Sequence, residues 1–185
     1  RTGVGIKKYR NPADSWNVGG VIKAKVEPTI RYADVLLWYA EALNELTNSY
    51  TIKSWNNTEI TVNRDINEMK KSFSRVRYRA GLPDASDLEY ENSGDFRKVL
   101  KHERQIEFFI EAARYFDLRR WKDASVEEGK PIIGLNVDIA ETSRDQFYAE
   151  QPANMRKIFI MKMYLWPIPQ WELTKNSKLV QNPGW

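Results

Sequence analysis

Apolar side chains recur every three or four residues in three stretches of the chain, which is the spacing of one face of an α-helix. This pattern predicts helices over residues 30–47, 64–80 and 95–121. Gly81 and Pro83 follow the second helix, and a glycine with a proline shortly after it is typical of a helix C-terminus. The predicted fold class is therefore mainly α, with the first two helices forming an antiparallel hairpin and the third forming a long helix.

Glycine and proline divide the rest of the chain into irregular pieces. Six glycine and proline residues fall within the first 28 positions: Gly3, Gly5, Pro12, Gly19, Gly20 and Pro28. Residues 1–28 are therefore expected to be an irregular, extended lead-in, and residues 29–122 to be the helical region. Residues 123–185 contain further breaks of this kind, which predict a loop-rich C-terminal region.

The composition leaves little room for many kinds of catalytic and metal-binding chemistry. The chain has 185 residues with no Cys and one His, so thiol catalysis, cysteine-ligated zinc and a Ser/His/Asp triad are not expected. A hydrophobic content of 42%, with 12% aromatic residues, is enough for a packed core and excludes a disordered chain. We therefore expect a folded chain without a cofactor or a metal site.

Charge is distributed along the chain rather than concentrated in one patch. The formal net charge is +4, from 29 Lys and Arg against 25 Asp and Glu. The best candidate for a nucleic-acid-binding patch is the group of Lys71, Arg75 and Arg79 on the polar side of the second predicted helix. No phosphate-binding loop or nucleic-acid-binding motif accompanies it. Nucleic acid is not an expected partner. The longest apolar run, Val35–Ala40, is also far shorter than the roughly 20 residues of a membrane-spanning helix.

Acidic residues lie in the apolar stripe of the third predicted helix. Projected at about 100° per residue, Glu103, Glu107 and Asp117 share a face with apolar side chains. Because a buried, unpaired charge is costly, we expect these carboxylates to pair with arginines. The expected structural ion-pair network comprises Glu103, Arg104, Glu107, Glu111, Arg114, Asp117 and Arg120.

The same carboxylates allow a second interpretation, a catalytic pair for glycoside hydrolysis. Residues four apart on a helix have Cβ atoms roughly 5–6 Å from each other, so the spacing alone does not exclude it. Such a pair needs one carboxyl group held protonated, however, and neighbouring guanidinium groups favour the ionised form of a carboxyl. The structural network is therefore the preferred interpretation.

The outer face of the first predicted helix is unusual for a solvent-exposed surface. It carries Trp38 and Leu37 beside Asp34, Glu41 and Glu45. A Trp beside a Leu on a helix surface is expected to pack against another apolar surface. Two alternatives are open: this helix is packed on both faces within the chain, or a segment outside these 185 residues packs against it.

Four motifs follow one another along the chain: RYADVLLWYAEALNEL (31–46), INEMKKSFSRVRYRAGLP (66–83), HERQIEFFIEAARYFDLRRWK (102–122) and LWPIPQWELTKNSKLVQNPGW (165–185). In this order and at these spacings they resemble the C-terminal part of SusD/RagB-like proteins, the outer-membrane nutrient-binding lipoproteins of certain Gram-negative bacteria. One departure is Ala112, which stands where the family usually has Gly after the Glu, and which predicts an uninterrupted third helix.

The resemblance implies a fold with tetratricopeptide-like helical hairpins and no catalysis. It implies a protein on the outer-membrane surface that captures an oligosaccharide or another nutrient and delivers it to a SusC-like TonB-dependent transporter. Family members are usually far longer, so the chain is expected to be the C-terminal part of a longer protein, with the lipid anchor in the missing portion. The alternative is a structural helical module that docks on the transporter or on an upstream domain without a ligand site of its own.

The family motifs are framework sequences, so the ligand-site candidates come from physical reasoning. Sugar binding needs exposed aromatic faces that stack on pyranose rings, with polar groups nearby for the hydroxyls. Aromatic residues in loops are therefore the candidates, and they are Trp16, Trp55 and Tyr148. Ordinary packing is an equally open role for these three. The tryptophans within motifs are expected to be packing residues: Trp38, Trp121, Trp166 and Trp185.

Overall fold

The computed structural model describes residues 5–137, 143–153 and 157–185, and the chain forms two compact units. The first, which we call the helical unit, is Ala24–Arg114. The second, the terminal unit, combines Arg1–Lys23 with Tyr115–Trp185. Each unit is described by itself below.

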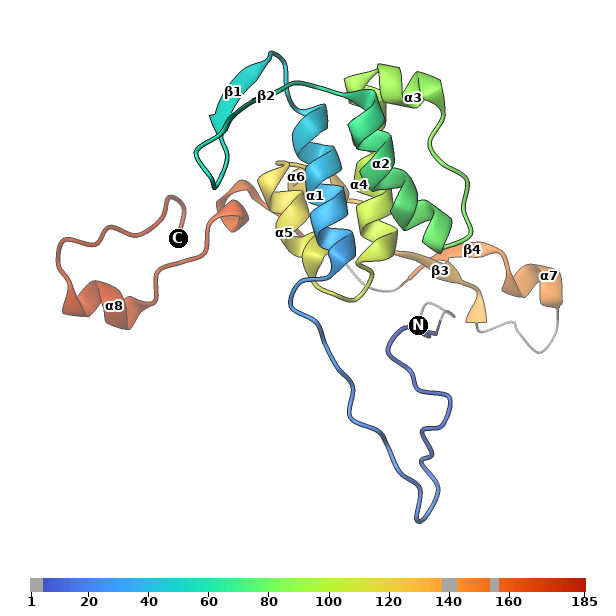
Figure 1. Ribbon diagram of the computed structural model, residues 1–185. Helices are drawn as coiled ribbons and strands as arrows, with labels where there is room; N and C mark the ends of the chain where they lie inside the picture. Colours follow the sequence, from blue (N-terminus) through green and yellow to red (C-terminus); the bar gives the residue numbers. More distant parts are fainter. Residues whose placement is uncertain (1–4, 138–142, 154–156) are drawn as a thin grey trace. The chain divides into compact units, whose positions relative to one another are not determined.

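The helical unit contains four helices and one β-hairpin (Figure 1). Its elements are α1 (Tyr32–Asn44), β1 (Tyr50–Lys53), β2 (Glu59–Val62), α2 (Ile66–Arg79), α3 (Asp87–Glu91) and α4 (Ser93–Glu107). Helix α1 packs against both α2 and α4, and α3 packs against α4. Leu37 of α1 is fully buried, so the prediction that Leu37 lies on the outer face of this helix beside Trp38 is wrong. The strands pair antiparallel, with Tyr50 opposite Val62 and Lys53 opposite Glu59. The prediction of a mainly helical fold with a helical hairpin is confirmed.

An aromatic cluster forms the centre of the helical unit. Phe73 of α2, Tyr90 of α3 and Phe96 of α4 are fully buried, and the ring centroid of Phe96 lies 5.1 Å from that of Phe73 and 4.8 Å from that of Tyr90. The Tyr90 hydroxyl donates a 2.8 Å hydrogen bond to Asp84 Oδ1. Burial, together with that bond to a carboxylate, raises the pKa of Tyr90 well above its ordinary value. The hydroxyl therefore stays protonated and keeps its carboxylate acceptor.

The prediction of one continuous helix over residues 95–121 is wrong. Helix α4 ends at Glu107 and the next helix, α5 (Ala113–Arg120), begins six residues later. Between them Ile110 and Ala112 adopt positive φ angles of 61° and 62°. A backbone in this left-handed region cannot continue the hydrogen-bond ladder of a right-handed helix. The apolar periodicity runs through the break, because both helices bury one face, and so the sequence pattern did not reveal it.

Ala112 contributes part of the conformational free-energy cost of this break, because left-handed backbone costs an L-residue with a Cβ atom roughly 1–2 kcal/mol and glycine almost nothing. We expect Ala112→Gly to raise the free energy of unfolding by about 1 kcal/mol and the melting temperature by about 2–4 °C. Ala42→Gly, at an exposed position inside α1, is the matched control and should lower stability by about 1 kcal/mol. Thermal melts of the three proteins check this, and an unstable Ala112→Gly variant would contradict it.

The terminal unit is built from short elements joined by loops. Following α5, they are α6 (Ala124–Glu127), β3 (Ile133–Leu135), α7 (Arg144–Phe147), β4 (Glu150–Pro152), the 3₁₀ helix η2 (Met161–Tyr164) and α8 (Gln170–Lys175). Strands β3 and β4 pair antiparallel, with Ile133 opposite Pro152. Within the described part of the chain, no helix combines the length and the apolar character that crossing a membrane requires.

Candidate functional site

Trp55 stands at the tip of the β1–β2 hairpin, and its side chain is 94% exposed. The tip is closed by hydrogen bonds from Ser54 N to Thr58 O at 2.8 Å and from Asn57 N to Ser54 O at 2.9 Å. The Asn56 side chain also accepts a bond from Thr58 N at 3.1 Å. The result is a hydrogen-bonded turn that presents the Trp55 indole ring close in sequence to the amide groups of Asn56 and Asn57 and the hydroxyl group of Thr58. Such a pairing of an aromatic face with hydrogen-bonding groups suits a sugar ring.

Trp16 occupies a loop of the terminal unit and is 85% exposed. Ser15 N donates to Val21 O at 3.2 Å and Lys23 N donates to Asp14 Oδ1 at 3.0 Å, so the two arms of this loop are tied together. The indole of Trp16 therefore projects from a closed loop, as that of Trp55 does, but in the other unit.

Tyr148, the third aromatic candidate, directly follows α7 in the terminal unit and is 57% exposed. Its ring contacts Phe147, with the centroids 5.2 Å apart. The Arg144 guanidinium carbon lies 5.9 Å from the Tyr148 ring centroid. The three predicted aromatic residues thus stand on three separate loops, with Trp55 in the helical unit and the other two in the terminal unit.

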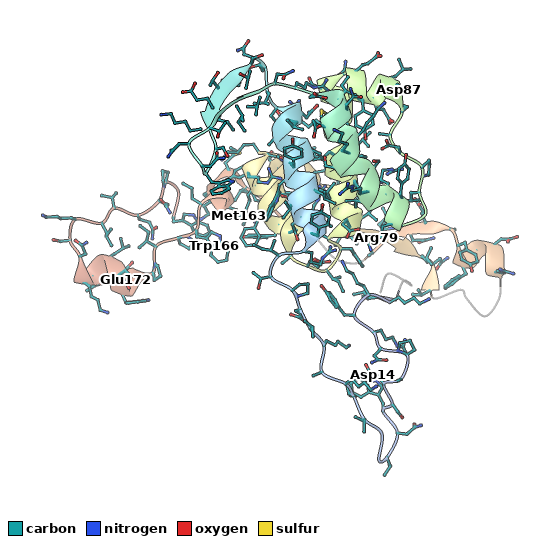
Figure 2. All side chains as sticks on the ribbon, viewed as in Figure 1. Asp14, Arg79, Asp87, Met163, Trp166 and Glu172 are labelled. Carbon is teal, nitrogen blue, oxygen red and sulfur yellow. The ribbon has the colours of Figure 1, made fainter. Side chains whose placement is uncertain are left out.

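Sequence reasoning did not propose as a site an aromatic hollow of about 370 Å³ in the terminal unit. Its most exposed tryptophan, Trp166 (Figure 2), is 70% exposed, although its place in a motif predicted a packing role. The Trp166 ring centroid lies 6.2 Å from that of Tyr115. The Trp185 indole N–H donates to the carbonyls of Lys162 and Leu165, both at 3.1 Å, which fixes the ring. The residues that line the hollow are Tyr115, Arg119, Met163, Leu165, Trp166, Pro167 and Trp185.

The wall of the aromatic hollow is mostly apolar, and its charged member, Arg119, is only partly engaged, because its Nε is buried without a hydrogen-bond partner among the described residues. The Arg119 guanidinium carbon lies 3.3 Å from the centroid of the Tyr115 ring, and Arg119 Nη1 donates to the Tyr115 carbonyl at 3.0 Å. A surface of this kind accepts an apolar group, either the face of a sugar ring or a side chain of a protein segment.

The acidic residues of α4 and the α4–α5 break make ion pairs within the helical unit. Arg31, the residue before α1, reaches two of them: its Nη1 lies 2.7 Å from Glu107 Oε1 and its Nε lies 2.9 Å from Glu111 Oε2. Arg79, at the C-terminal end of α2 (Figure 2), lies 2.6 Å from the other Glu107 oxygen. Arg31 Nη2 also donates to the Glu107 carbonyl at 3.2 Å, at the end of α4. Arg31 thus connects the C-terminal end of α4 with the segment between α4 and α5.

Electrostatics within this cluster favour the charged form of Arg31. Burial alone lowers the pKa of its guanidinium, but the hydrogen bonds to Glu111 and Glu107 outweigh that effect and raise the pKa above its ordinary value. Arg31 is therefore a permanent cation beside two carboxylates.

The remaining residues of the predicted network differ in burial and in the side chains that they contact. Glu103 is 2% exposed and lies 2.6 Å from Arg77 Nη1 of α2. Arg104 is buried, with its guanidinium carbon 5.0 Å from the Phe108 ring centroid. In the terminal unit, Asp117 Oδ1 lies 2.8 Å from Arg120 Nε. Arg114, at the end of the helical unit, is half-buried.

The sequence pattern did not indicate Arg31, Arg77 and Arg79 as partners of these carboxylates, because the three arginines lie outside the helical segment that holds the carboxylates. All three lie before α1 or on α2 and face α4 across the unit. A periodicity argument reports which face a residue occupies but not which helix packs opposite it.

Paired in this way, Glu103 and Glu107 are not presented to a substrate as a free acid and base. Among residues 5–137, 143–153 and 157–185, no group of three or more His, Cys, Asp or Glu side chains is placed to hold a metal ion. The exposed loop aromatics and the aromatic hollow are therefore better candidates for a ligand surface than these carboxylates.

The profile of the SusD family matches residues 1–185, which is the whole chain. The chain belongs to the SusD family. SusD-like protein P2 of Formosa agariphila is 29% identical over an alignment of 185 residues. The alignment covers 97% of this chain and 30% of that protein. The resemblance predicted from the four motifs is thereby confirmed.

Solved structures of family members share the fold. A SusD-like protein from Bacteroides fragilis superposes with a TM-score of 0.61 and 27% identity, covering 84% of this chain and 25% of that one. A second Bacteroides fragilis structure, described as a SusD-like carbohydrate binding protein, gives a TM-score of 0.58 and 28% identity, covering 81% of this chain and 28% of that one. The SusD-family chain thus spans less than a third of the length of these relatives.

Proposed function

We propose that this SusD-family chain belongs to a cell-surface protein that binds an oligosaccharide or a related nutrient and performs no catalysis. The family match over all 185 residues is the observation that carries the proposal. A relative described as carbohydrate binding supports the class of ligand. The ion pairs of Glu103 and Glu107 weigh against the glycoside-hydrolase alternative, because a hydrolase needs a carboxyl group that is free to protonate its substrate.

Delivery to a SusC-like TonB-dependent transporter completes the proposed role. It places the protein at the outer-membrane surface, held by a lipid in a portion of the polypeptide outside these residues. The family resemblance alone supports this part of the proposal.

Trp55 is the proposed stacking platform within this chain. Its ring is the most exposed of the three loop candidates, and the hairpin fixes the turn beneath it. An exposed ring on a fixed turn loses little conformational freedom when a sugar stacks on it. Asn56, Asn57 and Thr58 provide amide and hydroxyl groups for the sugar hydroxyls.

If Trp55 stacks on the ligand, Trp55→Ala should weaken glycan binding about tenfold, which corresponds to about 1.4 kcal/mol of lost stacking and contact. Trp171→Ala is the matched control, since Trp171 is an exposed tryptophan on α8 outside the proposed platform. Calorimetric titration with a glycan that the full-length protein binds measures both affinities, and the melting temperatures of both variants should match that of the parent.

Unchanged binding by Trp55→Ala would remove Trp55 from the site. Trp16→Ala and Tyr148→Ala then test the other two candidates in the same titration. If none of the three substitutions weakens binding, this chain contributes no loop-aromatic site. That result would favour the second candidate function, a helical module that docks on the transporter or an upstream domain, to which the exposed, apolar aromatic hollow also points.

A further inference from the structure

The loop that carries Trp16 also exposes a compact group of aliphatic side chains. Trp16, Val18, Val21 and Ile22 all belong to the terminal unit, and we call them the apolar tip. Val18 is fully exposed, Val21 is 67% exposed and Ile22 is 47% exposed. A sugar ring stacks on an aromatic face, so glycan binding would account for Trp16 but not for the three aliphatic residues. Apolar side chains exposed together in this way mark an interaction surface.

A tight turn presents the apolar tip. Gly20 N donates to Asn17 O at 2.8 Å, and Gly19 between them has a φ of 79°, a left-handed value that favours glycine. A Cβ atom at Gly20 would collide with the Ser15 carbonyl oxygen, so the second arm of the loop lies directly against the first. Val18 therefore stands at the corner of a closed turn, and no rearrangement is needed to expose it.

Basic side chains stand at the base of this loop. Lys7 and Arg10 line a hollow of about 470 Å³ together with Asp14, the residue at which the loop begins (Figure 2). Lys23 lies at the other end of the loop, where its backbone N–H donates to Asp14 Oδ1 at 3.0 Å. Lys7, Arg10 and Lys23 are exposed, and none of these three makes an ion pair within the described part of the chain. The loop thus combines an exposed apolar tip with unpaired positive charge at its base.

This combination fits an anionic lipid surface. At a membrane–water interface, Trp rings lie at the level of the headgroups and aliphatic side chains reach the boundary of the acyl chains. Lys and Arg side chains are attracted by the negative surface charge of anionic lipids. A protein segment packed on the loop would account for the apolar tip alone. We propose that residues 14–23 dock on an anionic lipid surface, with the apolar tip among the headgroups and the unpaired basic side chains close to the phosphate groups.

Co-sedimentation with lipid vesicles tests the proposal on the full-length protein, expressed without lipidation so that no acyl anchor contributes to binding. One set of vesicles is pure phosphatidylcholine, and the other is an equimolar mixture of phosphatidylcholine and phosphatidylglycerol. The expected result is that the parent protein binds the mixed vesicles at least about tenfold more strongly than the neutral ones, because only the mixed vesicles attract the basic side chains.

Variants separate the apolar contribution from the charged one. Trp16→Glu should weaken binding to the mixed vesicles about tenfold or more, and Trp16→Phe should retain most of it. Arg10→Gln should weaken binding to the mixed vesicles about fivefold and leave binding to neutral vesicles unchanged. Trp171→Glu, at an exposed position on α8, is the matched control and should bind as the parent does.

Several results would overturn the proposal. They are no binding to the mixed vesicles, equal binding by Trp16→Glu and the parent, and equal binding to both kinds of vesicle. A lower melting temperature for Trp16→Glu would mean that another part of the polypeptide covers the apolar tip. Loss of glycan affinity in Trp16→Glu, without vesicle binding by the parent, would assign the loop to the glycan. Vesicle binding that depends on Trp16 in a protein that binds no glycan would support lipid docking and contradict the glycan-binding function.

Discussion

Replacement of Arg31 by methionine is expected to lower the free energy of unfolding by about 2–3 kcal/mol. This is less than the loss for a fully buried ion pair, because the Arg31 side chain is 24% exposed and Glu107 keeps its pair with Arg79. Methionine preserves most of the side-chain length and apolar contact but removes the charge. The carboxylates of Glu107 and Glu111 then lose their common partner while their side chains are only 8% and 12% exposed. The Glu107 carbonyl at the end of α4 loses a donor as well.

Urea unfolding of the parent and variant measures this loss. Arg75→Met is the matched control, because Arg75 lies on the exposed side of α2 and donates a 3.2 Å hydrogen bond to the Tyr32 hydroxyl rather than pairing with a buried carboxylate. The control should change the free energy of unfolding by no more than about 0.5 kcal/mol. A loss below about 1 kcal/mol for Arg31→Met would mean that the helix break is held by packing rather than by this ion pair.

Glu103→Gln is expected to cost about 2–3 kcal/mol of stability. Glutamine keeps the shape of the side chain and one acceptor oxygen, but it leaves the Arg77 guanidinium facing a neutral amide in a nearly buried position. Glu91→Gln, an exposed position at the end of α3, is the control and should cost less than about 0.5 kcal/mol.

The same variant separates the two roles considered for the α4 carboxylates. A structural role predicts a destabilised protein, seen as a lower urea midpoint. A catalytic role predicts normal stability together with loss of glycan turnover. An unaltered urea midpoint for Glu103→Gln would contradict the structural role of the Arg77–Glu103 pair.

The sequence predicted α1 and α2 well, because each has an uninterrupted apolar stripe, and α2 also has clear start and end signals. Asp65 caps the start of α2 by accepting bonds from Asn67 N and Glu68 N, and Gly81 follows its end with φ 74°. It failed at the α4–α5 break, because Ile110 and Ala112 are not residues that favour positive φ. The chain tolerates them where Arg31 bonds both Glu107 and Glu111, a contact between residues about 80 positions apart.

The candidate site shows the same limit of sequence reasoning. The exposure of Trp55 followed from its polar neighbours in a loop, but nothing local indicated the β-hairpin that holds it. The aromatic hollow depends on residues from two stretches, since Tyr115 and Arg119 of α5 meet Trp166 and Trp185 of the closing motif. A cavity between distant segments arises from tertiary packing, which a reading of spacing along the chain does not contain.

Affinity electrophoresis of the full-length protein through gels that contain single polysaccharides tests the central claim most directly. A glycan-binding role predicts that at least one polysaccharide retards the protein relative to a non-binding control protein, and that no gel shows degradation of its glycan. Uniform mobility across a broad polysaccharide panel would contradict the proposed function.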